Sequence, residues 1–196
     1  MLSSINPLVE RSRNNRWSVT VAWYALGAIA AGAAFGALLG LLGAGLAGVG
    51  VPRQLLIGGT LVAVVIGMAF DLGWIRRPLP SPHRQVNERW LDTYRGWVYG
   101  FGFGAQLGVG VFTIVTTAAV YQAWALAVLS TSLWAGAGIG AVFGAVRFAT
   151  MMWVRRVNDP VALRNVLAGT QRWLPMAKRV ALSSQGVAAV VLLAAL

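Results

Sequence analysis

The chain of 196 residues has no cysteine and a single histidine, His83. Without thiols it can form no disulfide bond, thiolate metal site or thiol redox couple. One histidine cannot supply both axial ligands of a bis-histidine haem or metal site within one chain. We therefore expect a protein without a metal and without another cofactor.

Charged residues are also scarce, at 11% of the chain. A soluble domain usually carries about 25%. Hydrophobic residues make up 58% of the chain, and the mean hydropathy is +0.69. Because so few polar side chains cannot coat a water-soluble globule, the composition indicates a protein embedded in a lipid bilayer.

Acidic residues are the scarcest charged group, with 5 against 16 Lys and Arg, which leaves a net charge of +11. In a soluble protein this excess would suggest nucleic-acid binding. Here the arginines cluster beside apolar segments, where such residues set membrane topology. We expect anionic lipid headgroups, and no nucleic acid, as the partner of these basic clusters.

The apolar runs predict an all-α, polytopic membrane helix bundle of about five transmembrane helices. A bilayer core needs about 20 helical residues, and five runs approach or exceed that length: 17–48, 54–75, 96–129, 133–154 and 180–196. Two basic loops separate them, and each is expected to hold an interfacial amphipathic helix, at 84–95 and 160–173. The first run follows a basic head and is longer than a cleavable signal sequence, which favours an uncleaved signal anchor.

The positions of Lys and Arg predict the topology. Fourteen of the 16 fall in the N-terminal head and in the loops 76–95 and 155–179. Five spans with a cytoplasmic N-terminus place all three clusters in the cytoplasm. We therefore expect a multi-pass protein of a bacterial inner (plasma) membrane.

The chain also repeats itself. Trp74-Ile-Arg-Arg matches Trp153-Val-Arg-Arg, and Phe35-Gly-Ala-Leu-Leu-Gly matches Phe103-Gly-Ala-Gln-Leu-Gly, which aligns Leu38 with Gln106. This predicts a single membrane domain, 1–196, built from parallel units 17–95 and 96–173 and a terminal span 180–196. Many secondary transporters contain such repeats, although a duplicated hairpin without transport explains the pattern as well.

The stretch Arg95–Tyr121 is expected to be the core helix of the bundle. It carries Gln106, Thr113, Thr116 and Thr117 within an apolar, glycine-rich run. Thr113 and Thr117 share a helix face, so with Gln106 they are candidates to line a polar substrate path. The alternatives are an interhelical hydrogen bond from Gln106 and threonines that bond their own helix backbone.

Two further charged residues fall inside apolar runs. Arg147 lies eight residues before Arg155, and Asp71 lies five before Arg76. Charged side chains at that depth usually face the bundle interior or a cavity. We therefore predict that Asp71 and Arg147 form a pair on the substrate path. The alternative is that Arg147 extends back to the cytoplasmic surface.

Small residues recur at helical spacing in both long apolar runs. We expect Gly36, Gly40, Gly104 and Gly108 to be close-packing positions, because a residue without a side chain lets two membrane helices approach closely.

The glycine-rich span GFGFGAQLGVGVFT, in a small protein with repeated membrane hairpins, resembles the DsbD/CcdA and LysE-type membrane transporters. Members of that group typically have six spans in two inverted three-span units, and their redox branch carries one cysteine in the first span of each half. Here the corresponding part reads Gly108-Val109-Gly110-Val111, so no functional residue and no electron transfer carry over. The resemblance implies the fold of a small-solute exporter or permease.

The sequence shows no nucleophile–base–acid triad, phosphate-binding loop or metal-ligand spacing, so we expect that the protein is not an enzyme. The function that we predict is transport of a small solute, with an anion as one candidate, at a site between the glycine-rich spans. The alternative is a non-catalytic structural or accessory subunit that packs against a partner membrane protein. Either way we expect a homo-oligomer or a complex with such a partner.

Overall fold

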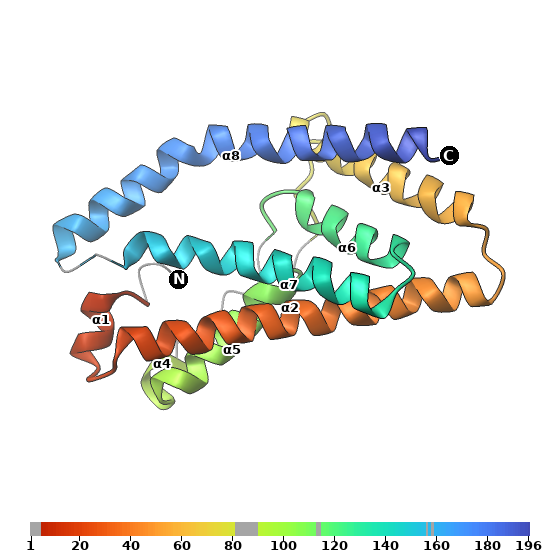
Figure 1. The fold of residues 1–196 in the computed structure, drawn as a ribbon. Helices are drawn as coiled ribbons and strands as arrows, with labels where there is room; N and C mark the ends of the chain where they lie inside the picture. The colour runs from red at the N-terminus through yellow and green to blue at the C-terminus, as the bar shows by residue number, and fades with distance from the viewer. Residues whose placement is uncertain (1–4, 81–89, 113–114, 156, 158) are drawn as a thin grey trace.

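The structure, a computed structural model, describes residues 5–80, 90–112, 115–155, 157 and 159–196, and these contain helices and no β-strand (Figure 1). The elements are α1 (Pro7–Ser12), α2 (Trp17–Gly48), α3 (Arg53–Leu72), α4 (Trp90–Thr93), α5 (Gly96–Val109), α6 (Ala119–Leu129), α7 (Leu133–Ala149), the 3₁₀ helix η1 (Thr150–Val154) and α8 (Pro160–Ala194).

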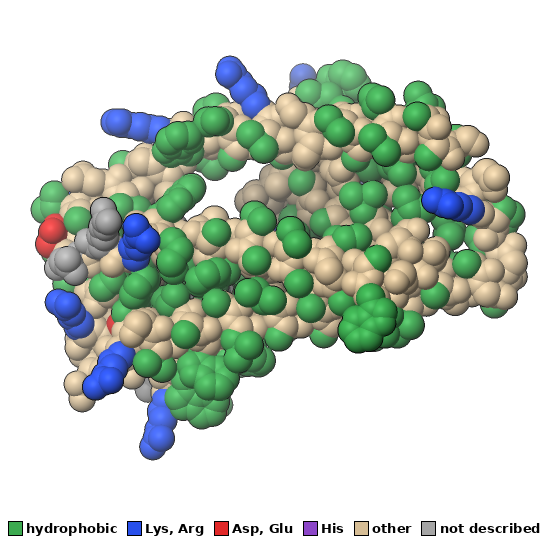
Figure 2. Space-filling model, viewed as in Figure 1, with side chains coloured by type: hydrophobic (Ala, Val, Ile, Leu, Met, Phe, Trp, Pro, Cys, Tyr) green, Lys and Arg blue, Asp and Glu red, His purple; other side chains and the backbone are tan. Residues whose placement is uncertain are grey.

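Four stretches are long and apolar enough to cross a membrane, and α6 is a shorter apolar helix. The four are α2, α3, α7 continued by η1, and α8. The predicted fold class, an all-α polytopic membrane bundle, is therefore confirmed. On the face in Figure 2, most Lys and Arg side chains lie toward the end that carries α1 and the start of α8.

Helix α2 is the centre of the bundle, with α5 and α7 packed along it. Backbone meets backbone at these contacts. A Cβ atom on Gly36 would collide with the carbonyl of Gly136 in α7, and one on Gly40 with the carbonyl of Ser132. The glycines of α2 thus allow α7 to approach to a distance that no side chain would permit.

The contact between α2 and α5 has the same character. A Cβ on Gly104 would collide with the carbonyl of Tyr24, and one on Gly108 with the carbonyl of Ala28. All four glycines singled out in the sequence are buried at such helix–helix contacts.

The predicted core helix, Arg95–Tyr121, is not continuous. Helix α5 ends at Val109, α6 begins at Ala119, and the chain between them is not helical where it is described. Gly110 has a φ of +75°, a conformation that glycine adopts at little cost and that ends the helix. The run 96–129, predicted as one crossing, is thus divided into two short helices, and we call it the broken crossing.

Helix α8 also differs from its prediction. The interfacial helix at 160–173 and the span at 180–196 are parts of one helix of 35 residues. Asp159 caps its start by accepting a hydrogen bond of 2.7 Å from Ala162 N, and Pro160 occupies the first turn, where proline fits. Pro175 lies inside the helix, which bends rather than ends (Figure 1).

The predicted helix at 84–95 is tested only in part. Of the helix expected at 84–95, the structure describes residues 90–95, where α4 is helical, and 84–89 lie outside the described residues. The internal repeat and the cytoplasmic N-terminus stay predictions.

Candidate functional site

A buried carboxylate marks the strongest candidate site. Asp71 is 9% exposed and accepts hydrogen bonds from two other segments of the chain. Thr117 Oγ1 donates to its Oδ2 at 2.7 Å, Gln185 Nε2 to the same oxygen at 2.6 Å, and Ala118 N to both oxygens at 3.1 Å. We call these four residues the Asp71 centre.

Three helices build this centre. Asp71 is the last residue but one of α3, Ala118 is the N-cap residue of α6, and Gln185 lies on α8. Gly67, one turn before Asp71, leaves room for the start of α6, because a Cβ there would stand 2.9 Å from the Cβ of Ala118. The break in the run 96–129 therefore brings the first turn of α6 against the carboxylate.

The Asp71 carboxylate meets the N-terminal end of α6. A helix N-terminus carries partial positive charge and unpaired N–H groups, and a carboxylate satisfies both. The bonds that Gln185 and Thr117 donate are short, at 2.6 and 2.7 Å. Thr117 Oγ1 also accepts from Ala119 N at 3.3 Å, which leaves its proton for Asp71.

Two glutamine oxygens near this centre have no donor. Gln185 is 1% exposed, and its Oε1 has no hydrogen-bond partner. Gln122 Oε1 on α6 is likewise buried and unpartnered. Gln122 lies one turn after Ala118, so the two share a face of α6. Buried acceptors without a donor are rare in native proteins, so the centre has acceptor capacity that a ligand could use.

The predicted pair between Asp71 and Arg147 is wrong. Helix α3, with Asp71, packs on α6 and α8, whereas α7, with Arg147, packs on α2. The Arg147 guanidinium lies 5.6 Å from the centre of the Phe143 ring, a cation–π distance. Equal depth along two spans did not imply that the spans are neighbours.

The other predicted path residues are dispersed. Gln106 is half-buried on α5, its side chain forms no hydrogen bond among the described residues, and its backbone carbonyl accepts from Gly110 N at 3.2 Å. Thr113 lies outside the described residues, and Thr116, which is not one of the path candidates, is exposed. Of the path candidates, the structure brings together Asp71 and Thr117. A role of Gln106 or Arg147 in a path stays a prediction.

Sequence reasoning missed two functional candidates. Gln185 was hidden in the last apolar run, where a lone buried amide is the signal that could have found it. Glu10 lies in the basic N-terminal head, where a carboxylate is expected to be exposed, yet it is fully buried. Tyr99 Oη and Thr20 Oγ1 donate to its carboxylate at 2.6 Å each, which ties α1 to α5 and α2.

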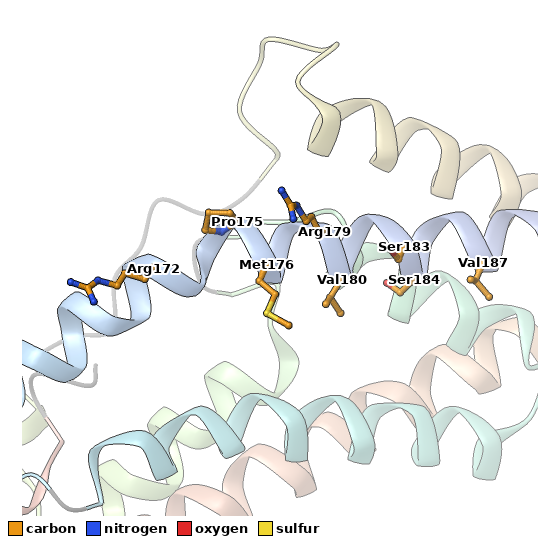
Figure 3. Close-up of a pocket in the computed structure, with 8 residues that line it drawn as sticks. All are labelled: Arg172, Pro175, Met176, Arg179, Val180, Ser183, Ser184 and Val187. Atoms are coloured by element: carbon orange, nitrogen blue, oxygen red, sulfur yellow. The ribbon is translucent and has the colours of Figure 1, made fainter.

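A groove of about 910 Å³ runs along α8. Figure 3 shows the residues that line it: Arg172, Pro175, Met176, Arg179, Val180, Ser183, Ser184 and Val187. The Met176, Val180 and Val187 side chains point from α8 toward α7, and the space-filling view is hollowed between α8 and the rest of the bundle (Figure 2).

Comparison with known proteins gives one group of relatives. The chain is 32% identical over 165 residues to the methylamine utilization protein MauF of Methylorubrum extorquens AM1, with 84% of this chain and 56% of MauF covered. It is 32% identical over 164 residues to MauF of Methylophilus methylotrophus, with 81% and 54% covered. The chain thus spans about half the length of the curated relatives it matches. No solved structure matches it.

The family described as "Cytochrome C biogenesis protein transmembrane region" matches residues 2–181, which is most of the chain. The resemblance to DsbD/CcdA proteins that the glycine-rich span carries is therefore confirmed at the level of the family. With membrane-spanning helices and this match, the chain is a multi-pass membrane protein that belongs to the family of the cytochrome c biogenesis transmembrane region.

Proposed function

We propose that this protein carries a small solute across a bacterial inner membrane and that the Asp71 centre is its solute site. The single observation behind the proposal is a buried carboxylate at the break of a membrane helix, held by α3, α6 and α8.

General physics supports this assignment. A charged side chain inside a membrane is costly, and such residues usually mark substrate or ion pathways. Transporters commonly bind solutes where a helix is interrupted, because the free backbone groups at the break can contact the solute. Both features meet here, since Asp71 lies in a candidate span and α5 and α6 form a broken crossing.

In this role the chain catalyses no chemical reaction and serves a pathway as an accessory protein. The relatives are named for methylamine utilization, and we propose that solute movement by this chain supports a comparable pathway. The cytoplasmic N-terminus belongs to the proposal as well. Its support is that the basic clusters lie in the head and in the two loops predicted to be cytoplasmic.

Flux through liposomes tests the proposal. The purified protein, reconstituted in liposomes, should speed the entry of at least one solute from a panel of small cations, anions and neutral polar molecules. Asp71→Asn should slow that flux at least tenfold, whereas Thr116→Ala, at an exposed position near the break, should leave it unchanged. Wild-type protein that is folded but no faster than empty liposomes for every solute would refute transport.

A second candidate is a scaffold that packs against a partner membrane protein. The observation that favours it is the groove on α8 and the exposure of every residue from 171 to 180. A photo-crosslinker at Met176 should then capture one partner protein in native membranes, whereas one at the exposed Leu38 of α2 should not. Equal capture at both positions, or none at either, would contradict this candidate.

A further inference from the structure

We infer that the Asp71 centre binds a small ammonium-type cation, meaning a monovalent cation with N–H donors. The inference names the solute class of the site proposed above and rests on that proposal only in assigning transport. Binding itself can be measured without flux.

The first reason is the negative charge that a carboxylate brings to this site. Among the residues that the structure describes, Asp71 is the one acidic residue inside a candidate membrane span. Its partners are a hydroxyl, a backbone N–H and a side-chain amide, and no ion pair reaches it from the described residues. A carboxylate without a counter-charge in a buried site is costly, so a bound cation would stabilise it.

The helices α3, α6 and α8 place no Lys or Arg beside the Asp71 carboxylate. Helix α6 contains no charged residue. On α8 the nearest charged residue is Arg179, which is exposed and lies six residues before Gln185, about 9 Å along the helix. On α3 itself the charged residue besides Asp71 is Arg53, at the opposite end of the helix.

The second step is the unused acceptors. Asp71 Oδ1 receives a single shared N–H at 3.1 Å, whereas Oδ2 receives three bonds. Gln185 Oε1, on the amide that contacts Asp71, is unpartnered at a residue that is 1% exposed. Gln122 Oε1 is a further buried acceptor without a donor. Acceptors in excess call for a ligand that donates hydrogen bonds.

The third step separates the cation from other ligands. An anion would face the carboxylate and unpaired acceptor oxygens, so like charge disfavours it. A proton on Oδ2 would turn an acceptor of three bonds into a donor that faces donors. An ammonium group offers a positive charge with several N–H donors on a compact centre, as a lysine ammonium does. It therefore satisfies both the charge and the acceptors.

Calorimetric titration of the full chain in detergent micelles tests the inference. The probes are ammonium chloride and methylammonium chloride, with sodium and potassium chloride at the same ionic strength and pH. We expect saturable binding of the two ammonium ions, at least tenfold tighter than that of the alkali ions. Asp71→Asn should abolish it, and Gln185→Met should weaken it at least tenfold.

Matched controls keep these variants interpretable. Gln171→Met replaces an exposed glutamine of the same helix and should bind as the wild type does. Circular dichroism and a thermal melt establish whether Asp71→Asn is folded. Should it not fold, Gln185→Met, which leaves the carboxylate in place, decides the question.

The outcomes separate this inference from the proposed function. Equal binding of sodium, potassium and ammonium, or ammonium binding unchanged in folded Asp71→Asn, overturns it. Liposome flux of neutral or anionic solutes without ammonium binding also overturns it, but leaves transport standing. Ammonium binding without any flux refutes transport and leaves the cation site standing.

Discussion

Two segments of this chain begin alike and fold differently. Phe35–Gly40 in α2 and Phe103–Gly108 in α5 have nearly the same sequence, and both are helical with buried glycines. Two residues later, α2 has Leu42 and continues to Gly48, whereas α5 has ended and Gly110 adopts a φ of +75°. The difference teaches that small residues allow helices to touch, while the sequence that the two segments share does not determine whether the helix continues beyond it.

The two segments also differ in what holds them. Helix α2 is fixed by backbone contacts to α5 and α7 along its length. The broken crossing depends in addition on a side chain from another helix, since Asp71 binds the first turn of α6. The continuous segment acts as scaffold and the broken one positions polar groups.

The largest expected effect comes from adding bulk to the continuous segment. Gly36→Leu should destabilise the protein by more than about 3 kcal/mol, because its side chain would collide with the backbone of α7. Thermal unfolding in micelles and the yield of folded protein measure it. Gly45→Leu, in the same helix with open space around it, should cost little. Equal costs would mean that the α2–α7 contact is not backbone to backbone.

The next effect removes the carboxylate that holds the broken crossing. Asp71→Ala should cost about 2–4 kcal/mol in the free energy of unfolding, because it leaves three donors unpaired, two of them buried. Asp159→Ala, at the exposed cap of α8, removes one bond and should cost about 1 kcal/mol. Unfolding by a denaturing detergent compares the two. A smaller loss for Asp71 than for Asp159 would contradict the buried site.

A third substitution acts on the break itself. Gly110→Ala should cost about 1–3 kcal/mol, because a side chain at positive φ is strained and its Cβ would stand 2.9 Å from the Phe143 ring. Gly138→Ala, in α7 with nothing near it, should be neutral or slightly stabilising. The thermal melts of both variants decide whether the break is obligatory.

A smaller effect is expected from the hydroxyl beside Asp71. Thr117→Val keeps the shape but removes one donor to the carboxylate, at a cost of about 1 kcal/mol. The adjacent Thr116→Val, at an exposed position, should change the melting temperature by less. A reversed order would place the hydroxyl of Thr116, not that of Thr117, on the carboxylate.

The smallest effect concerns the two charged residues that the sequence placed together. Asp71→Asn and Arg147→Gln should add independently, with a coupling below about 0.5 kcal/mol, because the residues share no partner. A double-mutant cycle on the free energy of unfolding measures it. A coupling above about 1 kcal/mol would restore the predicted pair.

The sequence predicted the membrane class and the contact positions because both depend on local pattern. Apolar length identifies spans, and glycines at Gly36 and Gly104 leave room for another helix whichever one it is. The partners of Asp71 depend on which helices are neighbours, and spacing along the chain does not encode that. Gln185 reaches Asp71 across 114 residues, and Glu10 reaches Tyr99 across 89.

The break at Gly110 and the continuity of α8 are two features of the fold that the sequence did not predict. Gly110 is one glycine in a glycine-rich run, and nothing in its immediate sequence distinguishes it from Gly108, which is helical. The sequence predicted two separate helices, at 160–173 and 180–196, yet α8 continues through Pro175 because one missing hydrogen bond bends a helix without ending it.

The contact between Asp71 and Gln185 also has a consequence for biosynthesis. Translation proceeds from the N-terminus, so α3 and α6 leave the ribosome before the end of α8 is made. The carboxylate can thus meet Thr117 and Ala118 while its amide partner has not yet been synthesised. We expect docking of α8 to be the step that completes the Asp71 centre. Its timing then sets how long the Asp71 carboxylate lacks one of its hydrogen-bond donors in the nascent bundle.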